Sequence, residues 1–324
     1  MPGELANRPL AVVAIGGNAL ARPETDAGGT PEEMWSAAHA AAGHLADLAA
    51  AGLRLVVTHG NGPQVGDELR RAELAAAEVA SLTLDVAVAH TQGGIGYVLA
   101  RTLGDALSAR GLARPVAALV TQTVVDAGDP AFQHATKPIG PHLTAEHAQA
   151  LAAARGWAVR PVEGGRWRRV VASPEPVDVL ELAAIQCLLA GGAVVIAGGG
   201  GGVPVVRAGA GYEGIAAVVD KDLVSALIAQ RLGADLLLIA TDVEQVARDF
   251  GTPAARPIRQ LTSGEAHLML ADGDFPAGSM GPKIAAALRF VDSGGGRAVI
   301  TDIRHMMAAW RGEAGTELVA EGNT

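Results

Sequence analysis

The chain has 324 residues, of which 49% are hydrophobic and only 3% aromatic, and its formal net charge is −9. This length allows one large α/β domain or two coupled lobes. The acidic balance argues against a nucleic-acid-binding protein, because no basic stripe offsets it. The single cysteine, Cys187, excludes an internal disulfide and a cysteine-based zinc site. It lies in an apolar helical run, and we expect it in the core.

No apolar run reaches the roughly 20 residues that span a bilayer. The apolar start of the chain is interrupted by glycines and lacks a preceding charged region, so it is better explained as a first buried strand than as a signal peptide. The sequence therefore predicts a cytoplasmic protein without a membrane segment.

Strand-like and helix-like segments alternate from residue 10 onward. The first half is predicted to hold strands at 10–15, 53–58 and 115–125 and helices at 31–51, about 64–80 and 94–110. From residue 178 a helix leads to strands at 193–197, 236–243 and 297–302, with helices at 219–235 and 281–295 and a short exposed helix and edge strand in the last sixteen residues. This alternation is typical of a mainly parallel sheet covered by helices on both faces.

The alternation fails between about residues 126 and 173. This stretch is rich in proline, glycine and charge, with one short helix at 144–155. We interpret it as an inserted lid or subdomain that does not belong to the sheet.

Three predicted strands end in glycine-rich turns: Gly16-Gly17-Asn18, His59-Gly60-Asn61-Gly62 and Gly198 to Gly202. In an open α/β sheet, ligands bind outside the carboxyl ends of the strands. Glycines there let backbone N–H groups approach an anion, and a following helix adds its positive end. Tight connections would also use glycine, but three such turns favour an anion site.

Lysine is unusually rare, with three copies against 22 arginines. Lys221 and Lys283 each lie at the start of a predicted helix, where a cation opposes the helix dipole. Lys137 lies in the predicted lid. Lysine is a compact point charge that arginine does not replace, so these positions indicate a bound anion, with solvated surface lysines as the alternative.

The common phosphate and metal motifs are absent. The chain has no G-x-x-x-x-G-K-[ST], no G-x-G-x-x-G after a strand, and no protein-kinase H-R-D or D-F-G motif. Its nine histidines show no zinc-ligand spacing, so no protein metal site is predicted.

Seven segments resemble carbamate kinases, in that family's order, and the resemblance covers about residues 10 to 319. The segments are GGNAL (16–20), THGNGPQVG (58–66), DPAFQHATKPIGP (129–141), WRRVVASPEP (167–176), GGGGVP (199–204), VDKDL (219–223) and PAGSMGPK (276–283). The first is shared across the amino-acid kinase superfamily, whereas THGNGPQVG, TKPIGP and GSMGPK together are specific to carbamate kinases.

The resemblance implies an ATP-dependent phosphotransferase that interconverts MgATP and carbamate with MgADP and carbamoyl phosphate. It implies one amino-acid kinase domain, an open, mainly parallel, eight-stranded αβα sandwich with a small protruding subdomain, usually assembled as a homodimer. The carbamate side would occupy about residues 8–190, including the lid, and the nucleotide side about residues 191–324. The pathway implied is ATP formation in arginine or ureido-compound breakdown.

The resemblance also implies roles for individual residues. The catalytic group would be Lys137, Lys221, Asp222 and Lys283; the substrate-binding residues Gly16, Gly17, Asn18, Gly60 and Asn61; and the nucleotide-binding residues Gly199, Gly200, Thr241, Asp242, Gly278, Ser279, Met280 and Gly281. Mg²⁺ would bind mainly to the nucleotide phosphates. Ala247 stands where the family usually has tyrosine, which leaves the adenine contact open.

Three other readings remain. A second acid kinase of the same superfamily, of the acetylglutamate type, would keep the lysines but not the carbamate-specific lid motif. A catalytically silent nucleotide-binding or assembly protein on this fold would be expected to lose Lys221, Asp222 or Lys283, all of which are present. An oxidoreductase with a Rossmann fold shares the coarse architecture but lacks the fingerprint.

Overall fold

The computed structural model describes residues 7–16, 30–275 and 279–322. The predicted site residues Gly17, Asn18 and Gly278 lie outside these ranges. Within them no helix is long and apolar enough to cross a membrane.

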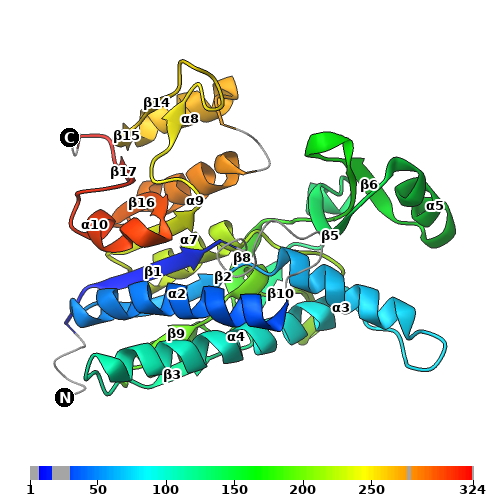
Figure 1. Ribbon diagram of the computed structural model, residues 1–324, viewed down its shortest axis with the longest axis horizontal. Coiled ribbons are helices and arrows are strands. Elements are labelled where there is room, and N and C mark those ends of the chain that lie inside the picture. Colours follow the sequence, from blue (N-terminus) through cyan, green and yellow to red (C-terminus); the bar gives the residue numbers. More distant parts are fainter. Residues whose placement is uncertain (1–6, 17–29, 276–278, 323–324) are drawn as a thin grey trace.

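An eight-stranded sheet forms the centre of the molecule (Figure 1). Its spatial order is β15-β17-β16-β12-β1-β2-β9-β3. All pairings are parallel except that of β16 with β17, as expected from the sequence. The strands are β1 (Leu10–Ile15), β2 (Arg54–His59), β3 (Val116–Ala118), β9 (Val194–Ile196), β12 (Leu236–Thr241), β15 (Gln260–Thr262), β16 (Arg297–Asp302) and β17 (Thr316–Val319).

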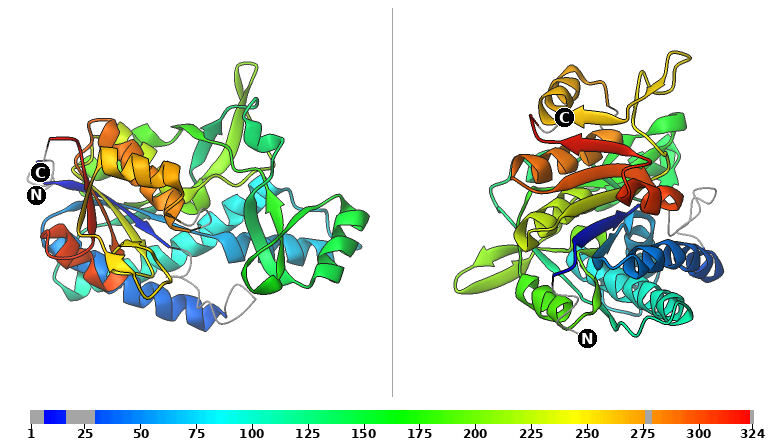
Figure 2. Two further views of the ribbon diagram at one scale, coloured as in Figure 1. Left: turned by 90° about the horizontal axis from the view of Figure 1, so that it is seen from above. Right: turned by 90° about the vertical axis from the view of Figure 1, so that its left-hand side faces the viewer.

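Helices cover both faces of this sheet (Figure 2). Strand β1 explains why: it is apolar throughout, and alternate residues enter the two cores, with Val12 in one and Val13 in the other. One face carries α2 (Pro31–Ala50), α4 (Leu84–Ala109) and α10 (Met306–Trp310). The other carries α6 (Leu182–Ala190), α7 (Lys221–Leu232), α8 (Ser263–Asp272) and α9 (Met280–Asp292). The predicted αβα sandwich is confirmed.

Smaller sheets flank the carboxyl end of the main one. One has the order β11-β10-β4-β8, from β4 (Gln122–Val125), β8 (Pro176–Val179), β10 (Val203–Ala208) and β11 (Gly211–Gly214). A two-stranded sheet joins β13 (Ala247–Arg248) to β14 (Arg256–Pro257). Short 3₁₀ turns occur at Pro130–Phe132, Glu163–Gly165, Gly199–Gly201 and Ile303–His305.

An antiparallel sheet with one helix projects from the body as a subdomain, which we call the lid (Figure 1). It consists of β5 (Lys137–Leu143), α5 (Ala145–Arg155), β6 (Ala158–Pro161) and β7 (Trp167–Val171). The body contacts it through α3 (Gly62–Leu74). The contact is close: a Cβ added to Gly66 of α3 would lie 2.0 Å from the Cα of Gly140 in β5. The division into carbamate and nucleotide sides, and the lid boundaries at 126 and 173, remain predictions.

Five expectations need correction. The strand predicted at 115–125 is two strands, β3 and β4, in different sheets. Between them the backbone N–H of Thr121 donates to the Gln92 side chain, and its C=O accepts from that side chain and from the N–H of Val203 in β10. Helix α4 begins ten residues before the predicted start at 94, and α3 ends at Leu74 rather than 80. Strand β17 is interior, since β15 forms the edge. Cys187 is exposed, because α6 turns only Ile185 and Leu189 fully into the core.

Candidate active site

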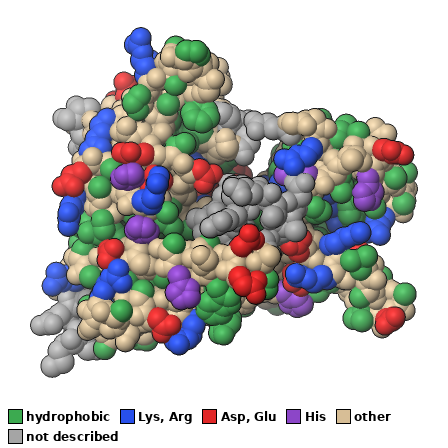
Figure 3. Space-filling model, viewed as in Figure 1, with side chains coloured by type: hydrophobic (Ala, Val, Ile, Leu, Met, Phe, Trp, Pro, Cys, Tyr) green, Lys and Arg blue, Asp and Glu red, His purple; other side chains and the backbone are tan. Residues whose placement is uncertain are grey.

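A cavity of about 610 Å³ lies at the carboxyl ends of the main strands, between the body and the lid. The space-filling view shows the recess that separates these two parts (Figure 3). Its lining includes all three lysines and residues from the ends of β1, β2 and β12, the starts of α3, α7 and α9, and the lid strand β5. Segments more than 200 residues apart in the chain therefore converge on one space.

Asp222 holds two of the lysines. Its Oδ1 accepts a hydrogen bond from Lys221 Nζ at 2.5 Å, and its Oδ2 accepts one from Lys283 Nζ at 2.9 Å. Lys221 is the first residue of α7, and Lys283 lies in the first turn of α9 behind Pro282. Each ammonium has three donors, so after bonding Asp222 each keeps two for the cavity that it lines. The pair is built to receive an anion.

The charges in this trio are strongly coupled. Burial would raise the pKa of Asp222, but the two ammonium groups outweigh it and hold that pKa well below its usual range. Burial lowers the pKa of Lys221 despite the attraction of Asp222. Burial would also lower the pKa of Lys283, but the attraction of the Asp222 carboxylate outweighs burial and raises that pKa. One buried carboxylate thus serves two cations, leaving an excess positive charge facing the cavity.

The third lysine comes from the lid. Lys137 Nζ donates to Asp220 Oδ2 at 2.5 Å. Asp220 is also the N-cap of α7, since its Oδ1 accepts from the backbone N–H of Asp222 at 2.8 Å. One side chain therefore fixes the helix that carries Lys221 and holds the lid lysine beside it.

The second and third glycine turns pack on each other at the floor of the cavity. Gly200 has φ +63°, and a Cβ there would lie 2.1 Å from Asn61 Nδ2, so only glycine fits. The Asn61 amide in turn donates to Thr91 Oγ1 of α4 at 2.8 Å. Thr121 Oγ1 accepts from the N–H of Gly198 at 2.9 Å. Buried polar side chains outside the glycine motifs thus fix the shape of the turns.

His59 lies beneath these turns, 1% exposed. A Cβ on Gly199 would lie 2.4 Å from its Nε2, and its Nδ1 is 3.0 Å from the Gly60 carbonyl oxygen. Burial is the main cause that lowers the pKa of His59 to about 4, so the imidazole is neutral and its Nδ1 donates to that carbonyl. In the sequence, His59 is recognisable only as part of a glycine turn.

A second, smaller cavity of about 170 Å³ adjoins the first at the end of β12. Thr241, Asp242 and Ser279 line both. The smaller one adds the predicted Met280 and the aromatic rings of Phe250 and Phe275, beside Ala247. Apolar walls next to a cavity lined by lysines suit a base attached to phosphates.

Most predicted residues in the described ranges meet here. Gly16, Gly60, Asn61 and Gly200 line the large cavity with the three lysines and Asp222, whereas Gly199 and Gly281 are buried and line neither. Sequence reasoning missed Asp220, His59, Thr91, Gln92, Thr121, Phe250 and Phe275. The aspartate alone had a detectable signal, because an acid directly before a predicted helix is an N-cap candidate.

With this geometry established, comparison with known proteins identifies the family. A sequence model described as the amino acid kinase family matches residues 9–302. The chain belongs to this family. A carbamate kinase of Pyrococcus furiosus is 41% identical over 310 residues, covering 95% of this chain and 98% of that protein. The carbamate kinase-like protein YahI of Escherichia coli K12 is 43% identical over 316 residues, covering 96% and 99%.

Solved structures of the family agree with the fold. Carbamate kinase from Giardia lamblia bound to AMP-PNP superimposes with a TM-score of 0.89 at 34% identity, covering 98% of this chain and 100% of that one. Family membership and the carbamate kinase relatives establish an ATP-dependent kinase. A more distant structure, N-acetylglutamate synthase from Neisseria gonorrhoeae, has a TM-score of 0.53 at 17% identity and shares the fold alone.

Proposed function

We propose that the protein is a carbamate kinase that transfers a phosphoryl group reversibly between MgATP and carbamate, giving MgADP and carbamoyl phosphate. The observation that carries this is the pair of lysines on Asp222, with Lys137 on the lid beside them. Phosphoryl transfer needs positioned positive charge more than covalent chemistry. The curated relatives named carbamate kinases, at about 40% identity over nearly the whole chain, support the same acceptor.

In the proposed reaction a carbamate oxygen attacks the γ-phosphorus while the bond to the β–γ bridging oxygen breaks and ADP leaves. Lys221 and Lys283 stabilise the negative charge on the transferring oxygens. Carbamate is already an anion, so no general base is required. Lys137 exchanges its bond with Asp220 for the phosphate and covers the site. The Gly60-Asn61 turn, with Gly16, Gly17 and Asn18, would hold carbamate.

The nucleotide would place its base in the smaller cavity and its phosphates near Ser279. Gly199, Gly200, Thr241, Asp242 and Gly278 to Gly281 remain the proposed nucleotide-side residues. Four carboxylates line the large cavity, from Glu175, Asp220, Asp222 and Asp242, and two of them, Asp220 and Asp222, already bind lysines, so the four do not form a protein cage for a metal. Mg²⁺ would therefore be carried by the nucleotide, whose phosphate charge it neutralises.

The test supplies carbamoyl phosphate and MgADP to the purified protein and measures ATP. We expect ATP to form, and expect no phosphorylation of acetate or N-acetylglutamate from MgATP. Absence of ATP from carbamoyl phosphate would contradict the proposal. Phosphorylation of N-acetylglutamate would favour the second acid-kinase reading, and binding of ATP without any turnover would favour a silent relative.

We further propose a cytoplasmic homodimer that forms ATP in arginine or ureido-compound breakdown. Its support is the family resemblance across the whole chain. Light scattering after size-exclusion chromatography should give twice the 32.7 kDa chain mass; a single-chain mass would contradict the dimer.

A further inference from the structure

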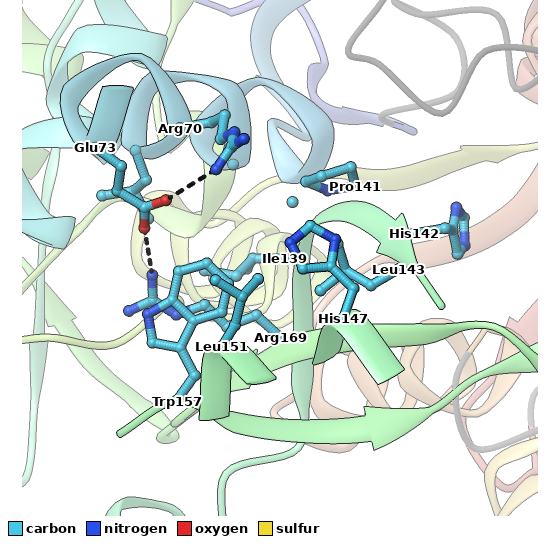
Figure 4. Close-up of a pocket in the computed structure, with 13 residues that line it drawn as sticks. Arg70, Glu73, Ile139, Pro141, His142, Leu143, His147, Leu151, Trp157 and Arg169 are labelled. Carbon is cyan, nitrogen blue, oxygen red and sulfur yellow. Dashed lines mark ion pairs between the residues drawn. The ribbon is translucent and has the colours of Figure 1, made fainter. Parts of the chain in front are cut away.

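A separate cavity of about 280 Å³ lies between α3 and the lid, behind the strand that carries Lys137 (Figure 4). The body contributes one wall through Leu69, Arg70 and Glu73 of α3. The lid contributes the rest, from β5, α5 and β7 and the ring of Trp157. The proposed reaction uses none of these side chains, although Ile139 lines both cavities.

The interior of this cavity is apolar. Leu69, Ile139, Leu143, Leu151 and Trp157 form its walls. At about 30 Å³ for a water-sized group, the volume holds about nine non-hydrogen atoms, the size of one aromatic ring with a small substituent. Such a space suits the apolar body of a small ligand rather than a nucleotide.

Cationic groups dominate one end. Glu73 lies between Arg70 and Arg169, with N–O distances of 3.7 and 3.9 Å (Figure 4). Both exceed hydrogen-bond length, while Arg155 makes the close contact with the same carboxylate. Three guanidinium groups thus share one carboxylate, and His142 and His147 also line the cavity.

Arg169 is the guanidinium group that Glu73 neutralises least, because its contact with that carboxylate is the longest of the three. Its guanidinium carbon lies 4.5 Å from the centre of the Trp157 ring, on which it stacks. Burial lowers the pKa of Arg169, and Arg155 acts in the same direction against the attraction of Glu73. A desolvated cation with weakly satisfied donors would bind an incoming carboxylate strongly.

We propose that this cavity, here called the α3–lid site, binds a small carboxylate with an aromatic or branched aliphatic body. The carboxylate pairs with Arg169 and Arg70, and the apolar body packs against Trp157 and Leu151. Because it would contact α3 and the lid together, the ligand holds β5, and with it Lys137, in place. The site lies outside the cavity in which phosphoryl transfer is proposed, so its existence does not depend on the identity of the phosphoryl acceptor.

The test measures benzoate binding to the full chain by isothermal titration calorimetry. We expect one benzoate per chain, with benzyl alcohol, benzylamine and acetate each binding at least tenfold more weakly, because each lacks the carboxylate or the apolar body. Saturating ADP should leave one benzoate bound per chain. Displacement by ADP would place benzoate in the catalytic cavity and overturn the proposal.

Two matched pairs of variants locate the ligand. Leu151→Trp fills the cavity and should weaken benzoate binding at least tenfold, whereas Ala153→Trp, on the exposed side of the same helix, should leave it within twofold. Arg169→Met removes the cation and Arg160→Met removes an exposed arginine of β6 that does not line the cavity. Equal affinities within both pairs, or no benzoate binding to the unmodified chain, would overturn the proposal. Because the readout is binding, failure here is distinct from failure of the kinase assay.

Discussion

Asp222 sets the distance between two cations by giving one carboxylate oxygen to each. The arrangement depends on ammonium groups, which are small enough to share a carboxylate and still face the cavity. A planar guanidinium has a different reach and donor geometry. The side chains of Lys221 and Lys283 are 11% and 14% exposed, so the site has little room for the longer group.

We therefore predict that Lys221→Arg and Lys283→Arg each lower kcat by about 10²–10³-fold, the range for losing one preorganised donor to a transition state. Circular dichroism should show an unchanged fold. Arg231→Lys, an exposed exchange at the end of α7, is the control and should retain activity. Near-normal turnover in both lysine variants would show that the choice of cation is unimportant.

His59 makes stability depend on pH. Its pKa is about 4 in the folded protein and about 6.5 when unfolded. Between pH 4 and 6.5 His59 is protonated in the unfolded chain but neutral in the folded protein. The contribution of neutral His59 to stability is therefore fully present above pH 6.5 and is lost as the pH falls toward 4. The difference corresponds to about 3 kcal/mol.

We predict that the unfolding free energy, measured in urea, decreases between pH 6.5 and 4 by about this amount from His59 alone. His59→Gln should be less stable at pH 7 but should show a smaller decrease across the same interval. An identical pH slope in the variant would exclude His59 as the titrating group.

The contact between α3 and β5 joins two sequence motifs that are far apart in the chain. Gly66 ends THGNGPQVG and Gly140 lies in TKPIGP, and their backbones touch without intervening side chains. Lys137 begins the strand that this contact holds. The close approach explains the glycine at position 66, and the φ of +68° explains the glycine at position 140.

We predict that Gly66→Ala destabilises the protein by about 1–3 kcal/mol, the usual cost of overpacking, and lowers kcat by displacing β5. Gly104→Ala, in α4 with no atom within 4 Å of the added methyl, is the control and should stabilise by about 0.5–1 kcal/mol. Thermal unfolding and the ATP assay measure both effects. A Gly66 variant as stable and active as the control would contradict the role of this contact.

The elements that could be predicted from the sequence are those whose structure is determined by neighbouring residues in the chain. Strands 10–15 and 297–302 match β1 and β16 because apolar runs bounded by turns are a local signal. The single strand predicted at 115–125 is wrong, because the backbone of Thr121 bonds to the Gln92 side chain, 29 residues away, and to Val203 in the smaller sheet. The helix starts carrying Lys221 and Lys283 could be predicted from local signals, whereas the bond between Lys137 and Asp220 spans 83 residues and has no sequence pattern.

Stability is distributed unevenly over the whole molecule. Both main cores share strands of one sheet, so β1 and β12 are buried on both faces. The lid has far fewer buried residues: Ala148 is the buried residue of α5, and β6 is largely exposed. Few buried contacts permit local opening at a lower free energy than global unfolding. The lid is therefore the part of the described chain best suited to move over a substrate.

We predict that hydrogen exchange is at least tenfold faster in α5 and β6 than in β1 and β12. Saturating MgATP should slow exchange in the lid, because phosphate would attract Lys137 and draw β5 toward the body. Lys137→Met should abolish that slowing, and because it also removes the ion pair with Asp220, exchange in the lid of the free variant should be at least as fast as in the unmodified chain. Peptides covering β3, at the edge of the sheet away from the nucleotide, serve as the internal reference. If MgATP slowed exchange in the lid of the Lys137 variant as much as in the unmodified chain, other contacts would drive lid closure, and Lys137 would not be its cause.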